Sequence, residues 1–409
     1  MNNPMNAVLL FSIFLVSVCM AYSTLPVTEA DSTADHITGL KWKGLQSSNA
    51  GLSGNMTVVV INETILYADE QIESFVDYIL DEVQVLYPNV NVNITYAPGS
   101  TEARNITLLA LQNNSTDYIV SVGSNFARTL VLHSNIVQWI EGINFTHVRN
   151  IGFIDSRYPF DQSHLERFSV AEFNHGQGGF MAGVKSAVMT ENHKIGVLLD
   201  PSTNFQSNNI VFKQNQQTFL SGFIAGVRYA GEHLLNNTDI LVKAKAFDNS
   251  IYQSPAQTTQ TLLKDLKESF GADVVLNLMS GVDPVVMTEA ATLGLDVVVC
   301  GANQTQAQLS MVQRLEVLFM DMLNYWNQTE TEETYSQVFD IGSPAMSLTD
   351  YGFGGSDDSM LAIQANVTSG IILVPSNLFL NSKATNGFGY LSIFLVTGSL
   401  LLVRRFKHS

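Results

Sequence analysis

The chain has 409 residues, more than one ordinary hydrophobic core accommodates and about right for two lobes with additional segments. Hydrophobic residues make up 46% of it and charged residues 14%, which excludes a largely disordered chain. The net charge of −17 argues against nucleic acid and against anionic lipid surfaces as partners. Cys19 and Cys300 both lie in apolar segments, so we expect no disulfide framework.

Residues 1–23 are predicted to be a signal peptide. Residues 8–21 (VLLFSIFLVSVCMA) are apolar but too short to span a bilayer comfortably, and Ala21-Tyr22-Ser23 fits a small-x-small cleavage site. No Lys or Arg precedes the apolar run, so a buried N-terminal helix stays open as the alternative. Residues 24–54 are rich in Ser, Thr and Gly without periodicity, which is typical of a linker.

The next segments alternate between strand and helix patterns at short spacing. Apolar positions at helical spacing predict an amphipathic helix over 70–87, with Ile72, Phe75, Ile79, Val83 and Leu86 on its buried face. Strands are expected at 55–62, 90–96, 117–123 and 148–155, and further helices at 104–112 and after Phe126 through Leu132. This alternation predicts a parallel sheet with right-handed crossovers.

Residues 172–200 contain a strand end, a Gly-rich turn, a helix at 179–189 and a buried strand at 194–200 that ends in Asp200. Small residues along one side of that helix are expected to let it lie close to a sheet; they are Gly179, Ala182, Gly183 and Ala187. The alternation then repeats, with helices at 212–230, 258–270, 284–293 and 309–326 and strands at 240–246, 272–279 and 296–300.

We therefore predict an α/β fold with two doubly wound parallel-sheet lobes over 55–375 and a cleft between them. Lobe 1 is expected at about 55–160 with part of 306–330, and lobe 2 at about 161–305 with part of 331–375. Residues 376–386 form a spacer, and 387–403 are uncharged and followed by Arg404-Arg405, which predicts a transmembrane helix with 404–409 in the cytoplasm. A processed sorting tail remains the alternative.

Eleven Asn-x-Ser/Thr sequons indicate a surface glycoprotein, against the alternative of a chain merely rich in Asn, Ser and Thr. The main candidates are Asn55, Asn62, Asn93, Asn105, Asn144, Asn236, Asn327 and Asn366. The others are Asn113, Asn114 and Asn303.

We find no nucleophile elbow, P-loop, metalloprotease motif or Cys-x-x-Cys, so no catalytic site, metal site or cofactor is expected. His175 lies in a Gly-rich stretch, where a hydrogen-bonded turn residue is a more common role than a ligand or base.

Polar residues or glycines come directly after successive apolar strands. They are Ser124 and Asn125, Asp155, Asp200, Gly281 and Asp283, and Asn303. The carboxyl ends of parallel strands share one sheet edge, so these groups are expected to grip a polar ligand in the cleft. Each alone fits an ordinary helix N-cap equally well.

Six segments in order resemble one family: 117–130, 148–156, 172–200, 219–230, 271–281 and 296–306. Together they resemble the basic membrane protein family of ABC-transporter substrate-binding lipoproteins, which bind purine nucleosides, over about 55–375. The resemblance implies a type I periplasmic-binding fold that closes on its ligand by a hinge.

Three ligand contacts that the resemblance implies are altered in this chain. An acidic residue that binds ribose hydroxyls in the family is replaced by Asn303, and a Lys is expected near Gln313. The family's aspartate and stacking phenylalanine after the first strand are replaced by residues 65–70, which leave Asp69 as the nearby carboxylate. An amide in place of a carboxylate loses the charge-assisted bonds to a diol. Phe126, Phe180 and Phe219 remain as stacking candidates, unless they are core residues.

The resulting hypothesis is a cell-membrane, single-pass protein whose extracellular domain binds a small nucleoside-like ligand and delivers it to an ABC permease and its ATPase. The alternative is a surface receptor or glycoprotein that keeps the fold with a different ligand or none. A hydrolase on the same fold is the least favoured class.

Overall fold

The computed structural model describes residues 51–61, 69–97, 100–123, 147–155, 168–200, 212–301, 304–328, 335–350 and 358–375. The predicted signal peptide, spacer, terminal transmembrane helix and cytoplasmic tail lie outside these residues, as does most of the linker. No helix in the described ranges combines the length and apolar character that a membrane span requires.

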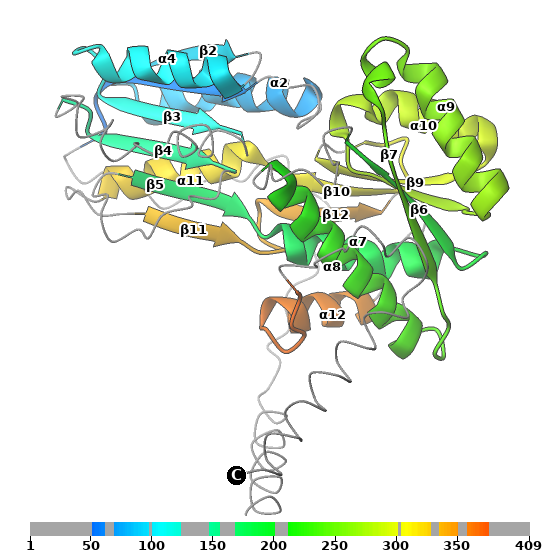
Figure 1. The fold of residues 1–409 in the computed structure, drawn as a ribbon. Helices are drawn as coiled ribbons and strands as arrows, with labels where there is room; N and C mark the ends of the chain where they lie inside the picture. Colours follow the sequence, from blue (N-terminus) through cyan, green and yellow to red (C-terminus); the bar gives the residue numbers. More distant parts are fainter. Residues whose placement is uncertain are drawn as a thin grey trace, which may run out of the picture. The chain divides into compact units, whose positions relative to one another are not determined.

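The first sheet, sheet A, is parallel throughout, as its alternating pattern predicted. Its strand order is β11-β5-β4-β3-β1-β2. The strands are β1 (Gly54–Ile61), β2 (Val90–Ala97), β3 (Tyr118–Val122), β4 (Asn150–Ile154), β5 (Phe168–Phe173) and β11 (Tyr335–Phe339). Figure 1 shows α4 (Ser100–Gln112) lying alongside β1, β2 and β3, which it contacts.

The amphipathic helix after β1 is divided into α2 (Asp69–Tyr78), a π-helical turn at Ile79–Val83 and α3 (Gln84–Leu86). Its predicted apolar face is buried from Ile72 to Val83. The prediction for Leu86 is wrong, because 46% of that residue is exposed. A π turn takes more residues than an α turn, so the positions after it rotate away from the face that precedes it.

The second sheet, sheet B, has the strand order β12-β10-β9-β8-β6-β7. The strands are β6 (Lys194–Leu199), β7 (Leu241–Ala246), β8 (Val274–Asn277), β9 (Asp296–Gly301), β10 (Leu309–Gln313) and β12 (Met346–Asp350). The helix predicted from residue 309 is wrong over its first residues, which form β10; α11 runs over Leu315–Gln328. We expected sheet B to be entirely parallel, but β12 pairs antiparallel with β10. Short apolar runs cannot be assigned by periodicity alone.

The helices that accompany sheet B follow the predicted order. They are α7 (His175–Met189), α8 (Phe212–His233), α9 (Pro255–Lys264), α10 (Asp283–Leu293) and the later α12 (Asp358–Thr368). Shorter turns occur at Asn249–Tyr252, Asp265–Phe270 and Ser280–Val282. α9 and α10 lie together beside the sheet in Figure 1.

The glycines of α7 pack mainly against a helix, whereas the sequence led us to expect a sheet. A Cβ built on Gly179 would lie 2.0 Å from the carbonyl oxygen of Phe219 in α8, and one on Gly183 would lie 2.1 Å from that of Phe223. The converse holds for α8, where a Cβ on Gly222 or Gly226 would lie 2.0 Å from a carbonyl oxygen of α7. The two helices therefore meet backbone to backbone, an approach that only glycine permits.

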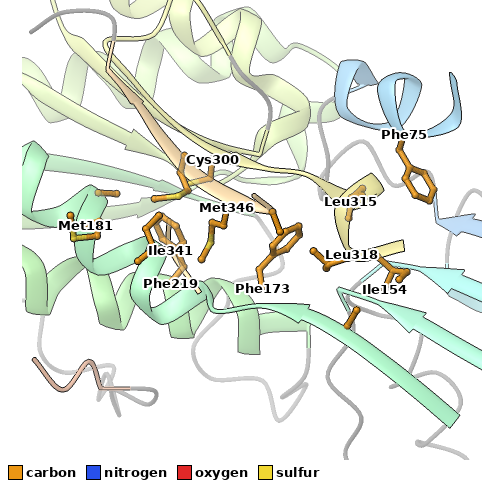
Figure 2. Packing of buried hydrophobic residues seen from close by; sticks show 14 of the residues in the cluster. Phe75, Ile154, Phe173, Met181, Phe219, Cys300, Leu315, Leu318, Ile341 and Met346 are labelled. Carbon is orange, nitrogen blue, oxygen red and sulfur yellow. The ribbon is translucent and has the colours of Figure 1, made fainter. Parts of the chain in front are cut away.

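Three segments pass between the sheets: residues 173–175, 313–315 and 339–346. Their apolar side chains belong to one buried cluster that also includes Met56 and Val58 of β1 and Ile195 and Val197 of β6. Figure 2 shows Phe173, Ile341, Met346 and Leu315 among the cluster's side chains. The core is thus continuous through the connections between the sheets.

Candidate functional site

Asp155 follows β4 at the carboxyl edge of sheet A, and it has an unusual backbone conformation. Its φ is 52°, in the left-handed region, and only 3% of the residue is exposed. Its backbone N–H donates to the carbonyl oxygen of Ala171 in β5 at 2.7 Å. Its Oδ1 lies 2.8 Å from Nε2 of His175, the first residue of α7. The carboxylate is therefore directed at the first connection between the sheets.

His175 links that carboxylate to the second connection. Its Nδ1 lies 3.2 Å from Nε2 of Gln313, the last residue of β10. An amide nitrogen can only donate, so Nδ1 accepts, and in the neutral ring Nε2 then carries the proton and donates to Asp155. His175 is hydrogen-bonded, as we predicted, but it begins α7 instead of lying in a turn. Asn174 caps the helix by accepting from the N–H of Gln177 at 3.3 Å.

Gln71 completes this group from the first turn of α2. Its Nε2 donates to the main-chain oxygen of Gln313 at 2.8 Å, and 6% of the residue is exposed. We call Gln71, Asp155, His175 and Gln313 the polar junction. The sequence predicted Asp155 and Gln313 as ligand contacts but missed Gln71. The available signal was a polar residue in the first turn of a helix that follows a buried strand.

Further hydrogen bonds tie the three connections together. The N–H of Asn174 donates to the carbonyl oxygen of Phe339 at 2.9 Å, and its Nδ2 donates to Oδ1 of Asp340 at 2.8 Å. The N–H of Ile341 donates to Oε1 of Gln177 at 3.1 Å. The N–H of Arg314 donates to the carbonyl oxygen of Ala345 at 2.8 Å. All three connections therefore exchange hydrogen bonds with one another around the polar junction.

At the carboxyl edge of sheet B, Asp283 is fully buried and begins α10. Its Oδ1 accepts from Nδ2 of Asn277 at 2.7 Å, so the carboxylate fixes the turn after β8 in which Gly281 lies. Ser280 Oγ donates to the carbonyl oxygen of Cys300 at 2.6 Å, and burial together with Asp283 raises the pKa of the Cys300 thiol. These contacts give Asp283 and Ser280 structural partners, and ligand contact by Asp283 and Gly281 stays a prediction.

The other predicted ligand residues are distributed less favourably. Phe180 and Phe219 are 2% and 3% exposed and lie in the hydrophobic core, where the ring of Phe180 packs against Tyr229 with centroids 5.5 Å apart. Asp200 is buried directly after β6, and the backbone of Asp69 begins α2. Ser124, Asn125, Phe126 and Asn303 lie outside the described residues.

The sequons also differ in accessibility. Asn55, Asn93, Asn113, Asn114 and Asn236 are exposed; Asn55 and Asn93 lie in strands, and the other three lie in the segments that precede β3 and β7. Asn105, Asn327 and Asn366 are half-buried, and Oδ1 of Asn327 accepts from the N–H of Leu52 at 3.0 Å. Asn62, Asn144 and Asn303 lie outside the described residues.

A hollow of about 490 Å³ lies on α2 and its π turn, and none of the four residues of the polar junction line it. Glu73, Asp77, Asp81, Glu82 and Glu316 line it, with Ser74 and Tyr78. Burial raises the pKa of Glu316, and burial together with Glu82 and Glu316 raises the pKa of Tyr78. No group of His, Cys, Asp and Glu among the described residues is arranged to hold a metal ion. This hollow contains none of the predicted ligand residues.

Residues 72–346 match the family described as ABC transporter substrate-binding protein PnrA-like (Bmp). No curated protein matches the chain. Among solved structures, a solute-binding protein of an ABC transporter system from Aeropyrum pernix K1 is 15% identical, with a TM-score of 0.53, and 79% of this chain and 82% of that chain are covered.

A transcriptional activator of the comK gene from Bacillus halodurans is 14% identical, with a TM-score of 0.53 and coverage of 78% of this chain and 98% of that chain. A periplasmic solute-binding protein from Actinobacillus succinogenes 130z with bound D-allose is 11% identical, with a TM-score of 0.51, covering 73% and 98%. At these identities the likeness shows the fold alone.

Proposed function

Because this chain belongs to the family of PnrA-like ABC transporter substrate-binding proteins, and is therefore a binding protein and not an enzyme, we propose that it binds a nucleoside-like solute for import. The solute lies between the carboxyl edges of sheets A and B. The family resemblance suggests the class of ligand, and the polar junction supports this location for the binding site.

The polar junction is the observation that carries this proposal. Its four residues come from the carboxyl ends of β4 and β10 and from the first turns of α2 and α7. In open α/β sheets, ligands bind at the carboxyl ends of strands, where loop groups converge. A buried polar group needs partners, and a set of such groups at a connection between two sheets can exchange partners when a ligand arrives.

The ligand need not be a purine nucleoside of the kind that the family binds. Asn303 replaces the family's acidic residue, and Gln313 stands where a Lys is expected. The amide of Gln313 is already engaged with His175, so it is positioned by the protein before a ligand binds. We therefore expect recognition through neutral amide groups and Asp155, with weaker charge-assisted bonding to a diol than in relatives that keep the carboxylate.

The proposed partners are an ABC permease and its ATPase, which follow from the family's role. We propose that the domain lies outside the cell and that residues 387–403 hold it at the membrane. Export with eukaryotic-type glycosylation predicts a mobility shift on treatment with a peptide N-glycosidase. Absence of any shift would count against such glycans at Asn55, Asn93 and Asn236.

Thermal unfolding against a panel of purine and pyrimidine nucleosides, sugars and small amides tests the ligand. A compound that binds only the folded state raises stability by RT ln(1 + [L]/Kd), about 2.7 kcal/mol at one hundred times Kd. We expect a nucleoside to produce the largest shift. If no compound stabilises the protein, the nucleoside proposal is wrong and the alternative of a surface receptor with another ligand or none gains support.

A further inference from the structure

Within the polar junction, the side-chain amide oxygen of Gln71 (Oε1) is buried and accepts no hydrogen bond from the residues that the structure describes. The residue is 94% buried, since 6% of it is exposed. A buried acceptor without a partner is costly, so such an atom in a native structure calls for a specific explanation.

The other end of the same amide is fixed. Nε2 of Gln71 donates to the main-chain oxygen of Gln313 at 2.8 Å, across 242 residues of sequence. Rotating the amide by 180° would place Oε1 against that carbonyl oxygen, and two acceptors repel each other. The bond to Gln313 therefore holds Oε1 in one direction, which is what a preorganised ligand contact requires.

Oε1 and the hydroxyl of Ser280 both lie beside Gly301, so close to it that a side chain there would crowd them. A Cβ on Gly301 would lie 3.0 Å from Gln71 Oε1 and 3.2 Å from Ser280 Oγ. Gly301 has a φ of 116°, so the backbone also disfavours any other residue there. Gln71 belongs to α2 beside sheet A, whereas Gly301 ends β9 of sheet B. A movement of the sheets away from each other would therefore separate Gln71 from Gly301, and we call the space that opens between them the gap.

The chemistry of the gap selects a class of ligand group. Ser280 Oγ already gives its proton to the carbonyl oxygen of Cys300, so it presents only lone pairs to the gap. Gln71 Oε1 is also an acceptor. Two acceptors fit a group that donates, such as a hydroxyl or an amino group. They repel a carboxylate or phosphate, which offers only further acceptors.

We propose that Gln71 is a ligand contact whose side-chain oxygen accepts a hydrogen bond from a hydroxyl or N–H group of an uncharged solute in the gap beside Gly301. This rests on the proposed function and narrows it to ligands that bring a donor to that position. Through Nε2, the same side chain connects the ligand to the second connection between the sheets.

The test is a binding cycle on the full chain with nucleosides as probes. Each nucleoside that binds the wild type is compared with its 2′-deoxy, 3′-deoxy and 5′-deoxy analogues and with analogues lacking the base amino group, on the wild type and on Gln71→Met. Methionine keeps the length and apolar volume of the side chain but removes the acceptor. Gln257→Met, on the exposed face of α9, is the matched control.

We expect Gln71→Met to weaken the parent nucleoside by about tenfold or more, and Gln257→Met to change nothing. One analogue should bind the wild type about tenfold more weakly than its parent nucleoside does. On Gln71→Met, that analogue and its parent should bind equally well, because the ligand's donor no longer has an acceptor to lose. The corresponding 5′-monophosphate should not bind more tightly than the nucleoside. If Gln71→Met does not fold, the analogues measured on the wild type decide: one of them should bind about tenfold more weakly than its parent, and unchanged affinity for every deoxy and desamino analogue would overturn the proposal.

The outcomes separate the two claims. If a nucleoside binds the wild type and Gln71→Met binds parent and analogues with unchanged differences, the role of Gln71 is wrong while the proposed function stands. If the monophosphates bind best, the gap does not exclude acceptor groups and the inference is overturned. If no probe binds the wild type, the nucleoside function fails and this inference fails with it.

Discussion

The first residue of α7 and the body of the helix make contacts of opposite kinds. Along its length, Gly179 and Gly183 bring the backbone against that of α8, at distances that leave no room for even a methyl group. At its first residue, His175 exchanges hydrogen bonds with Asp155 and Gln313. The first arrangement admits one packing only. The second consists of polar groups that can take other hydrogen-bond partners. Such contacts at a connection between the sheets allow one sheet to move relative to the other, whereas the close packing of α7 against α8 does not allow these two helices to shift.

The largest effect is expected where the helices touch. Gly183→Ala should destabilise the fold by about 2 kcal/mol or more, because its Cβ would lie 2.1 Å from a backbone oxygen and the helices must separate. Gly176→Ala is the matched control in the same helix, where the nearest atom would be 3.5 Å away. It should be neutral or slightly stabilising, since alanine favours a helix. Chemical denaturation measures both, and equal losses would show that helix packing is not the cause.

At the polar junction, His175→Leu should cost about 1–3 kcal/mol in the free energy of unfolding, because Asp155 and Gln313 each lose a hydrogen-bond partner in a buried place. His193→Asn, at an exposed turn where the backbone is left-handed and asparagine is tolerated, is the control and should change little. Stability of His175→Leu equal to that of the wild type would mean that the junction does not hold the connections together.

A smaller effect is expected outside both regions, at Glu316. Burial raises the pKa of this carboxyl above its ordinary value of 4.5, so the folded state binds its proton more tightly than the unfolded chain does. Stability contributed by this group is therefore lost as pH rises from about 4.5 through the raised pKa. Glu316→Gln should be more stable than the wild type at pH 7, and the difference should shrink below pH 4.5.

Thermal unfolding between pH 4 and pH 8 measures this difference. Glu73→Gln, at an exposed position in the same hollow, should give a smaller gain. A gain for Glu316→Gln that does not depend on pH would contradict the explanation by burial of a charge.

Much of the fold could be predicted because the chain alternates clearly between strand and helix patterns. The parallel order of sheet A follows from that alternation and from short connections. β10 could not be predicted, because LSMVQ is too short an apolar run to distinguish strand from helix. The start of α7 at His175 was missed because glycines usually weaken a helix, and here packing against α8 outweighs that preference.

The candidate site could be predicted only in part. Asp155 was found because it follows an apolar strand, and Gln313 because of the family resemblance. Gln71 was not found, because what distinguishes it is a hydrogen bond to Gln313, 242 residues away in the sequence, and such a contact leaves no local pattern. The aromatic candidates Phe180 and Phe219 show the reverse, since a residue type that suits stacking also suits a core, and both are buried there.

Hydrogen exchange of the wild type, with and without a saturating nucleoside that stabilises it, tests most directly whether the carboxyl edges of the two sheets form the binding site. We predict added protection at the ends of β4, β8 and β9, at the first turn of α2 and at residues 313–315. We predict no change at the opposite edge, around residues 113–117 and 236–239. Two results would contradict the placement of the binding site at the carboxyl edges. One is added protection only at the opposite edge or at the hollow on α2, and the other is no added protection at the carboxyl edges when the nucleoside is saturating.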